Sequence, residues 1–224
     1  MIMPSRSFYS ISRLLKPLSN IYALVVLSFL CAQIAYAVPV DTKSYDPICG
    51  VGVKVVGKSL VIGWDTPEGS TELTLNLSGQ GALVRSVAVA PGKGKVIEVV
   101  RDINPVTVLT VGQRDLNKRS GWTIFFDRTS RKPSESGPLT LKLKSAIVRS
   151  VGKRCMVDLG ELQGESFSGK LRFTIYAGCD LIHLQSVVQT KLDARALLYH
   201  AGLNCDPTGK TVSWIGLDDK LHQV

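Results

Sequence analysis

One predicted β-hairpin carries the polar side chains that are best spaced to bind a ligand. In Gly169–Thr190, two runs of alternating apolar and polar residues flank a short Ala-Gly-Cys-Asp break. Because successive side chains of a strand point to opposite faces, Arg172 and Tyr176 share a face with His183 of the second run. Their groups supply hydrogen-bond donors, acceptors and a ring, which is a set that can hold a sugar. We therefore predict Arg172, Tyr176 and His183 as ligand-binding residues, and the alternative is an ordinary solvated sheet face.

The other chemistry-bearing residues predict neither a catalytic centre nor a metal site. His183, His200 and His222 lie on separate segments without metal-ligand spacing, and no Cys-x-x-Cys or paired Cys/His spacing is present. There is no Gly-x-Ser-x-Gly or His-Glu-x-x-His motif, and nothing pairs two carboxylates for glycoside hydrolysis. We predict no catalytic residue, no metal and no cofactor, and we favour a protein that is not an enzyme.

A phosphate-loop pattern near the start of the chain is better interpreted as a hairpin. Gly52–Ser59, GVKVVGKS, matches Gly-x-x-x-x-Gly-Lys-Ser/Thr letter by letter. A phosphate loop must follow a strand and open a helix. Here the residues on both sides of Gly57-Lys58 are rich in valine and predict two strands joined by a tight turn. We expect no nucleotide. The net charge of the whole chain is +9, and Arg6, Arg13 and Lys16 lie in residues 1–37. The remaining excess of basic residues is spread over short clusters near turns, so we expect no nucleic-acid partner either.

The N-terminal segment has the three parts of a signal peptide. Residues 1–37 contain basic but no acidic residues, and an apolar run ends at Ala35-Tyr36-Ala37. The run is short for a membrane span, which needs about 20 apolar residues. We expect export to the periplasm or the exterior, with an uncleaved membrane anchor as the alternative. A linker over 38–50 and one domain over 51–224 follow.

The body of the chain predicts an all-β fold, a large antiparallel β-sandwich. Short runs of β-branched and aromatic residues alternate with turn signals, and no window of useful length has helical periodicity. The nearest helix candidate, Lys191–Leu203, could equally be a turn at Asp193-Ala194 that leads into a strand. Arg128–Pro138 is predicted as the longest polar loop. We expect Trp64, Trp122 and Trp214 to be core rings. The predicted strands are Val53–Val56, Leu60–Trp64, Glu72–Leu77, Leu83–Val89, Val96–Val100, Val106–Val111, Trp122–Phe126, Leu139–Val148, Cys155–Leu159, Leu171–Tyr176, Leu181–Thr190, Ala196–Gly202 and Val212–Leu217.

Three runs, GWTIFFDRTSRKPSESGPLTLKLKSAIV, GKLRFTIYAGCDLIHLQSVVQT and ARALLYHAGL, carry a family resemblance. This part, about 121–224, resembles the N-terminal β-rich region of large exported bacterial proteins, which is similar to the galactose-mutarotase-like β-supersandwich. The resemblance implies an extracytoplasmic sandwich that faces carbohydrate. Such proteins continue beyond this point, so an incomplete sandwich is an alternative. Mutarotases use histidines and a carboxylate in a cleft, and no residue here maps onto that set.

Three functions follow as hypotheses. The first is a noncatalytic module that binds polysaccharide or oligosaccharide, or is accessory to glycan processing. The second is a fragment of a glycan-active enzyme, a mutarotase, lyase or hydrolase relative. The third is a structural module of the cell envelope that pairs through an exposed sheet edge. Four cysteines of the exported part allow three disulfide pairings, among which the sequence does not choose, and buried free thiols are the alternative. They are Cys49, Cys155, Cys179 and Cys205.

Overall fold

The chain folds into strands. The computed structural model describes residues 38–92, 94–114, 133–206 and 211–224, and this part contains one 3-10 turn, η2 (Pro47–Cys49), but no α-helix. The predicted all-β class is confirmed. The strands are β1 Val40–Ser44, β2 Val51–Val56, β3 Ser59–Thr66, β4 Gly69–Asn76, β5 Val84–Pro91, β6 Ile97–Gln113, β7 Ser134–Pro138, β8 Thr140–Ser150, β9 Arg154–Gly164, β10 Phe167–Tyr176, β11 Ile182–Gln189, β12 Arg195–Cys205, β13 Ser213–Ile215 and β14 Leu221–Gln223.

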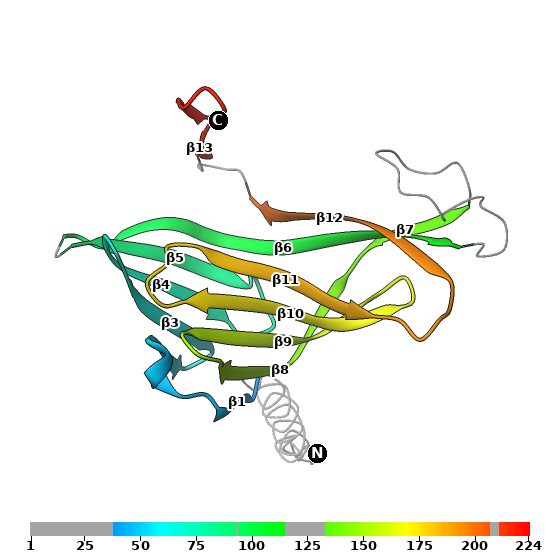
Figure 1. Ribbon diagram of the computed structural model, residues 1–224, viewed down its shortest axis with the longest axis horizontal. Coiled ribbons are helices and arrows are strands. Elements are labelled where there is room, and N and C mark those ends of the chain that lie inside the picture. The colour runs from blue at the N-terminus through cyan, green and yellow to red at the C-terminus, as the bar shows by residue number, and fades with distance from the viewer. Residues whose placement is uncertain (1–37, 93, 115–132, 207–210) are drawn as a thin grey trace, which may run out of the picture. The chain divides into compact units, whose positions relative to one another are not determined.

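Two sheets form the sandwich. The smaller sheet has five strands in the order β1-β8-β9-β10-β11, and the larger has seven, β12-β6-β5-β4-β3-β2 with β7 also paired to β6. All neighbours are antiparallel except β1, which runs parallel to β8. In the view of Figure 1, β8 to β11 form a layer in front of the larger sheet. A separate two-stranded sheet is formed by β13 and β14.

Strict alternation of apolar and polar residues builds one core between the sheets. Leu171, Phe173 and Ile175 of β10 are buried as predicted, and Ile182, Leu184 and Val188 of the edge strand β11 pack against the same core. Each fully buried side chain of this size stabilises the fold by about 1.5–3 kcal/mol. The core also contains Leu60, Ile62, Leu73 and Leu75 of the larger sheet and Val148, Val157 and Leu159 of the smaller.

The strand β6 is longer than the sequence predicts. Val96–Val100 and Val106–Val111 were expected to be separate strands, but Ile97–Val100 and Val106–Val111 both fall in β6, which is continuous through Pro105. Proline cannot donate a ladder hydrogen bond. On one edge of β6, Pro105 falls between Ile103, the last residue paired with β5, and Val108, the first paired with β7. The interruption of pairing on this edge lets the strand include a proline.

Part of the predicted polar loop is a strand, after which the chain passes from the larger sheet to the smaller one. The loop was expected over Arg128–Pro138, but its end forms β7, paired with β6. After one residue, Leu139, whose backbone N–H donates to the Thr107 carbonyl at 2.8 Å, the chain enters β8 of the smaller sheet. This crossing from one layer to the other is visible in Figure 1. Residues 115–132, including the predicted strand Trp122–Phe126, lie outside the described residues, as does the predicted signal peptide.

Predicted turns are found where the backbone needs special residues. Gly57 has φ of 58° at the first central position of the β2–β3 turn, which glycine adopts without strain. This confirms the hairpin interpretation of the phosphate-loop pattern. Ala194 has φ of 52° just before β12, so Lys191–Leu203 is the turn and strand rather than the helix. The expected linker 38–50 contains β1 and η2 and is therefore structured.

Candidate functional site

The three residues predicted to bind ligand share the outer face of the smaller sheet. Arg172 and Tyr176 lie on β10 and His183 on β11, where His183 is paired with Thr174. Their alternation with the buried Phe173 and Ile175 places them away from the core. The Tyr176 hydroxyl and the His183 ring have no hydrogen-bond partner among the described residues.

Arg172 belongs to an ion-pair cluster around one buried carboxylate. Asp158 of β9 is the cross-strand partner of Arg172, whose Nε and Nη2 donate to its two oxygens at 2.6 and 3.2 Å. Lys170 Nζ lies 2.7 Å and Arg149 Nη2 3.3 Å from the same carboxylate. Burial alone would raise the pKa of Asp158, but the hydrogen bonds from Arg172 and Lys170 outweigh it and hold that pKa below its usual value.

This cluster explains Arg172 as a structural residue first. A carboxylate with three cations within 4 Å has its acceptor sites occupied, and the bidentate guanidinium is oriented by it. Arg172, Tyr176 and His183 share one exposed face of the smaller sheet. None of them lines either of the two depressions described in the next paragraphs, a trough on the larger sheet and a hollow between the sheets. Sequence reasoning placed the three residues on one face but missed Asp158, because its contact with Arg172 depends on strand register.

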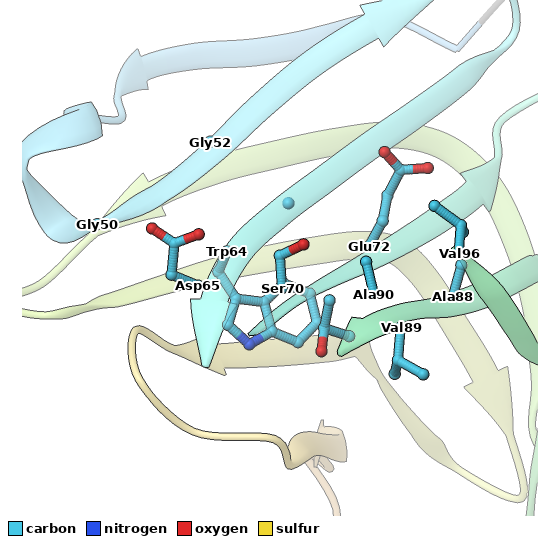
Figure 2. Close-up of a pocket in the computed structure, with 12 residues that line it drawn as sticks. Gly50, Gly52, Trp64, Asp65, Ser70, Glu72, Ala88, Val89, Ala90 and Val96 are labelled. Carbon is cyan, nitrogen blue, oxygen red and sulfur yellow. The ribbon is translucent and has the colours of Figure 1, made fainter. Parts of the chain in front are cut away.

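A shallow trough lies on the outer face of the larger sheet. Gly52 of β2 is directly opposite Gly63 of β3, Gly63 is opposite Glu72 of β4, and Glu72 is opposite Ala88 of β5. These four residues form one row across four neighbouring strands, and Glu72 is the only one of them with a long side chain. The trough has a volume of about 450 Å³. Asp65 and Ser70 line it as well, and Figure 2 shows them on the same side of the sheet as Glu72, opposite to Val89.

The two glycines are not required by the fold itself. Neither has a positive φ, and a Cβ added at Gly63 would come no closer than 4.0 Å to the nearest atom, the Thr71 carbonyl oxygen. At Gly52 the nearest contact would be 3.6 Å, an ordinary van der Waals distance. Glycine inside a strand costs about 0.5–1 kcal/mol relative to alanine. The effect of the pair is to leave the backbone accessible, as at sites where a ligand approaches a sheet closely.

Among the described residues, the trough is lined by two carboxylates and by no cation. Neither Asp65 nor Glu72 has a side-chain hydrogen bond or ion pair among the described residues, and no Lys or Arg lines the trough. Two free carboxylates and the Ser70 hydroxyl beside an exposed backbone can accept hydrogen bonds from a ligand rich in hydroxyl or amino groups. The available signal was a glycine just before the predicted strand Val53–Val56 and another, Gly63, within the predicted strand Leu60–Trp64. Gly52 was considered only as the first residue of the phosphate-loop pattern, and Gly63 was not singled out.

The tryptophans divide between the core and the surface. Trp64 is buried as predicted, and its Nε1–H donates to the Cys179 carbonyl at 2.8 Å. Trp214 was expected in the core but is exposed on β13, where it stacks on His222 of β14 with ring centroids 5.4 Å apart. A two-stranded sheet has no second layer to bury it. Trp122 lies outside the described residues.

The sandwich is open on the side of β11 and β12. Leu197, Tyr199 and Leu203 of β12 are opposite Val111, Leu109 and Pro105 of β6 and so share the inner face of the larger sheet. They are nevertheless 39%, 68% and 62% exposed. The cause is that the smaller sheet ends at β11 within the described chain, so that no strand covers β12.

A hollow of about 290 Å³ marks this open side. Its walls come from both sheets, and the Thr107 and Ser186 hydroxyls meet across it at 2.8 Å. Leu171 and Leu184 line it from the smaller sheet, and Ala201 and Leu203 from β12. Apolar side chains therefore surround the hollow, and the edge strands of the two sheets, β11 and β12, lie beside it; each has one edge without a partner strand within the described residues.

Comparison with known proteins adds no relative. No protein-family model matches the chain, and no curated protein matches it significantly in sequence. Among the described residues, no three His, Cys, Asp or Glu side chains are grouped as metal ligands. The same part of the chain has no helix of the length and apolar character that crossing a membrane requires.

Proposed function

We propose that this protein is an exported, noncatalytic β-sandwich that binds a neutral or amino-sugar polysaccharide in the trough of the larger sheet. The observation that carries the proposal is the glycine pair Gly52–Gly63 beside the unpartnered carboxylates of Asp65 and Glu72. The signal-peptide pattern supports export, and the resemblance to carbohydrate-facing sandwiches supports the ligand class.

The chemistry of the trough selects among glycans. Sugar hydroxyls are hydrogen-bond donors, and carboxylates accept such bonds more strongly than neutral groups do. A flat floor without side chains allows sugar rings to lie against the backbone of β2 and β3. Because the described lining residues include the carboxylates Asp65 and Glu72 and no cation, we expect a polyuronate to be repelled and a protonated amino sugar to be attracted.

A binding role is favoured over a catalytic one by the lining of the trough. The described histidines His183, His200 and His222 lie on β11, β12 and β14, and none lines the trough. A mutarotase-like centre needs histidine and carboxylate together in one cleft. The trough is also an open depression on a sheet face, which does not exclude water as most active sites do.

Binding of three polymers tests the proposal. The purified chain is titrated by calorimetry with a neutral β-glucan, a partly deacetylated amino-sugar polymer and a polyuronate. We expect binding to the first two. Glu72→Gln should weaken binding about tenfold or more, because a hydrogen bond to a charged group is worth about 1.5–3 kcal/mol. Glu135→Gln on β7, an exposed carboxylate that does not line the trough, is the matched control and should leave the affinity unchanged.

Two results would contradict the proposal. One is the absence of binding to all three polymers. The other is preferential binding of the polyuronate that is insensitive to Glu72→Gln and lost in Lys170→Gln, because it would move the site to the basic outer face of the smaller sheet. Export is tested separately by N-terminal sequencing of the protein secreted from a bacterial host, with Val38 as the expected first residue.

The open side favours a second function, self-association through strand addition. β12 exposes the apolar side chains Leu197, Tyr199 and Leu203 on the inner face. The hairpin β13–β14 exposes Ile215 and Leu221, and three-residue strands are too short to be stable alone. Within one chain the hairpin leaves β12 exposed, so the hairpin of a second copy is the occupant that we infer for the open side.

The oligomeric state tests this second function. Light scattering after size exclusion should show a dimer of the full chain, and Tyr199→Glu should give a monomer because it puts a charge on the apolar inner face. Val55→Lys, at an exposed apolar residue of β2 far from the open side, is the control and should remain dimeric. A monomer for the unmodified chain at high protein concentration would refute self-association.

A further inference from the structure

We propose that Cys49 and Cys155 form a disulfide bond that ties η2, at the start of the larger sheet, to β9 of the smaller sheet. This modification site is independent of the trough. Both cysteines are thiols in the structure and both are buried in the same core cluster.

A network of hydrogen bonds brings the two backbones together. The Asp46 carbonyl accepts from the Cys49 N–H at 3.2 Å and from the Ser150 hydroxyl at 2.9 Å, and the Asp46 N–H donates to the same hydroxyl oxygen at 3.0 Å. Ser150 of β8 is in turn the direct cross-strand partner of Cys155 on β9. Opposite residues in an antiparallel pair have Cα atoms about 4.5–5.5 Å apart. Cys49 is thus hydrogen-bonded to Asp46, Cys155 lies directly opposite Ser150, and Asp46 and Ser150 are hydrogen-bonded to each other.

The residue after Cys49 packs against the same region from another direction. A Cβ built on Gly50 would lie 2.9 Å from the Ala177 Cβ, so the backbone of Gly50 is in close contact with the end of β10. Ala177 N–H donates to the Lys153 carbonyl at 3.1 Å, two residues before Cys155. Cys49 is therefore held between the turn at β8–β9 and the end of β10, and Cys155 lies between the same two elements.

The thiols also interact electrostatically. Burial is the main cause that raises the pKa of Cys155 to about 12, and the charge of Cys49 raises it further. A thiol with so high a pKa is almost entirely protonated at neutral pH and reacts slowly. We therefore expect the bond to form while the chain is folding, before the core closes.

Cys205 is poorly placed to pair with Cys49 or with Cys179. Cys205 ends β12, and Cys49 directly precedes β2 at the opposite edge of the larger sheet. Five strand spacings of about 4.8 Å separate these edges, about 24 Å, whereas a disulfide needs Cα atoms within about 7 Å. Cys179 is bound through its carbonyl to Trp64 of β3, four spacings or about 19 Å from β12. These separations exclude Cys49–Cys205 and Cys179–Cys205, and Cys49–Cys155 is the pair that the contacts around Asp46 and Ser150 support.

The reaction is a thiol–disulfide exchange. The two thiols lose two protons and two electrons as the new S–S bond forms, and a small-molecule disulfide such as oxidised glutathione accepts them and leaves as two thiols. The bond closes a long loop between the sheets, which restricts the unfolded chain.

Refolding in a redox buffer tests the pairing. The full chain is refolded from guanidinium with oxidised and reduced glutathione, alkylated, and digested without reduction for mass spectrometry. We expect a peptide pair that joins Cys49 to Cys155. It should disappear in Cys49→Ser and in Cys155→Ser and persist in the control variants Cys179→Ser and Cys205→Ser. Reduction should lower the unfolding midpoint of the oxidised protein by on the order of 10 °C and leave that of the double Cys49→Ser/Cys155→Ser variant unchanged.

The peptide map of the unmodified chain decides the question even if a variant does not fold. A linked pair that includes Cys179 or Cys205 in place of either residue would overturn the assignment. Alkylation of all four thiols after complete refolding with oxidised glutathione would overturn it as well.

Discussion

The Arg172 guanidinium donates two hydrogen bonds, of 2.6 and 3.2 Å, to the Asp158 carboxylate, and these bonds join the adjacent strands β10 and β9. The arginine was one of three ligand-binding candidates predicted from the sequence, and the aspartate accepts the hydrogen bonds of its guanidinium. Lys170 and Arg149 also lie within 2.7 and 3.3 Å of the Asp158 carboxylate. The outer face of the smaller sheet therefore has one carboxylate surrounded by three cations.

Removing the carboxylate should destabilise the protein. Asp158→Asn leaves Arg149, Lys170 and Arg172 close together without their shared anion. We expect a loss of about 2–3 kcal/mol in the free energy of unfolding, the value of hydrogen bonds to a charged group, because the three cations keep contact with water. Denaturation by urea measures it. Glu161→Gln, which removes the exposed ion pair with Lys144, is the control and should lower the stability much less, because an exposed ion pair is screened by water.

The same carboxylate should make stability depend on pH in the acid range. The folded pKa of Asp158 lies below its unfolded value, because hydrogen bonds to cations outweigh burial. Its contribution is therefore complete above the unfolded pKa of about 3.9 and is lost as pH falls through the folded pKa. Urea midpoints measured from neutral pH down to about pH 2 should fall more steeply below about pH 4 for the unmodified protein than for Asp158→Asn. Parallel curves would mean that Asp158 titrates alike in both states.

Filling the trough should abolish ligand binding without harming the fold. A side chain at Gly63 projects into open space, and valine has a high preference for strands. We expect Gly63→Val to raise the free energy of unfolding by up to about 1 kcal/mol while glycan affinity drops at least tenfold. Gly202→Val, also in a strand with no atom near its Cβ position, should leave the affinity unchanged. Unaltered binding by Gly63→Val would place the glycan elsewhere.

A glycine in β10 should be far less tolerant than those in the trough. A Cβ on Gly169 would collide with the Val187 carbonyl oxygen and would lie 2.8 Å from the Val188 Cα. Gly169→Ala should therefore cost about 1–3 kcal/mol by pushing β11 away from β10. Thermal unfolding compared with Gly202→Ala, which meets no atom, checks this, and equal midpoints would show that β11 yields without cost.

The sequence predicted local features because they depend on neighbouring residues. Alternation of Leu171, Phe173 and Ile175 with polar residues identified both the strand and its buried face. Gly57 and the Asp193-Ala194 step indicated turns through their backbone preferences. By contrast, Val96–Val100 and Val106–Val111 were predicted as separate strands, because a single sequence does not reveal that β6 continues through Pro105, where pairing on one edge is interrupted.

By itself, the sequence determined the all-β class, most of the strands and which side chains share a face, since the two-residue period of a strand fixes these locally. Tertiary structure alone decided what covers each face and what stands opposite each residue. Asp158 meets Arg172, Gly52 meets Gly63 and β12 remains uncovered because of strand order and register, which are set by contacts between segments far apart in the chain.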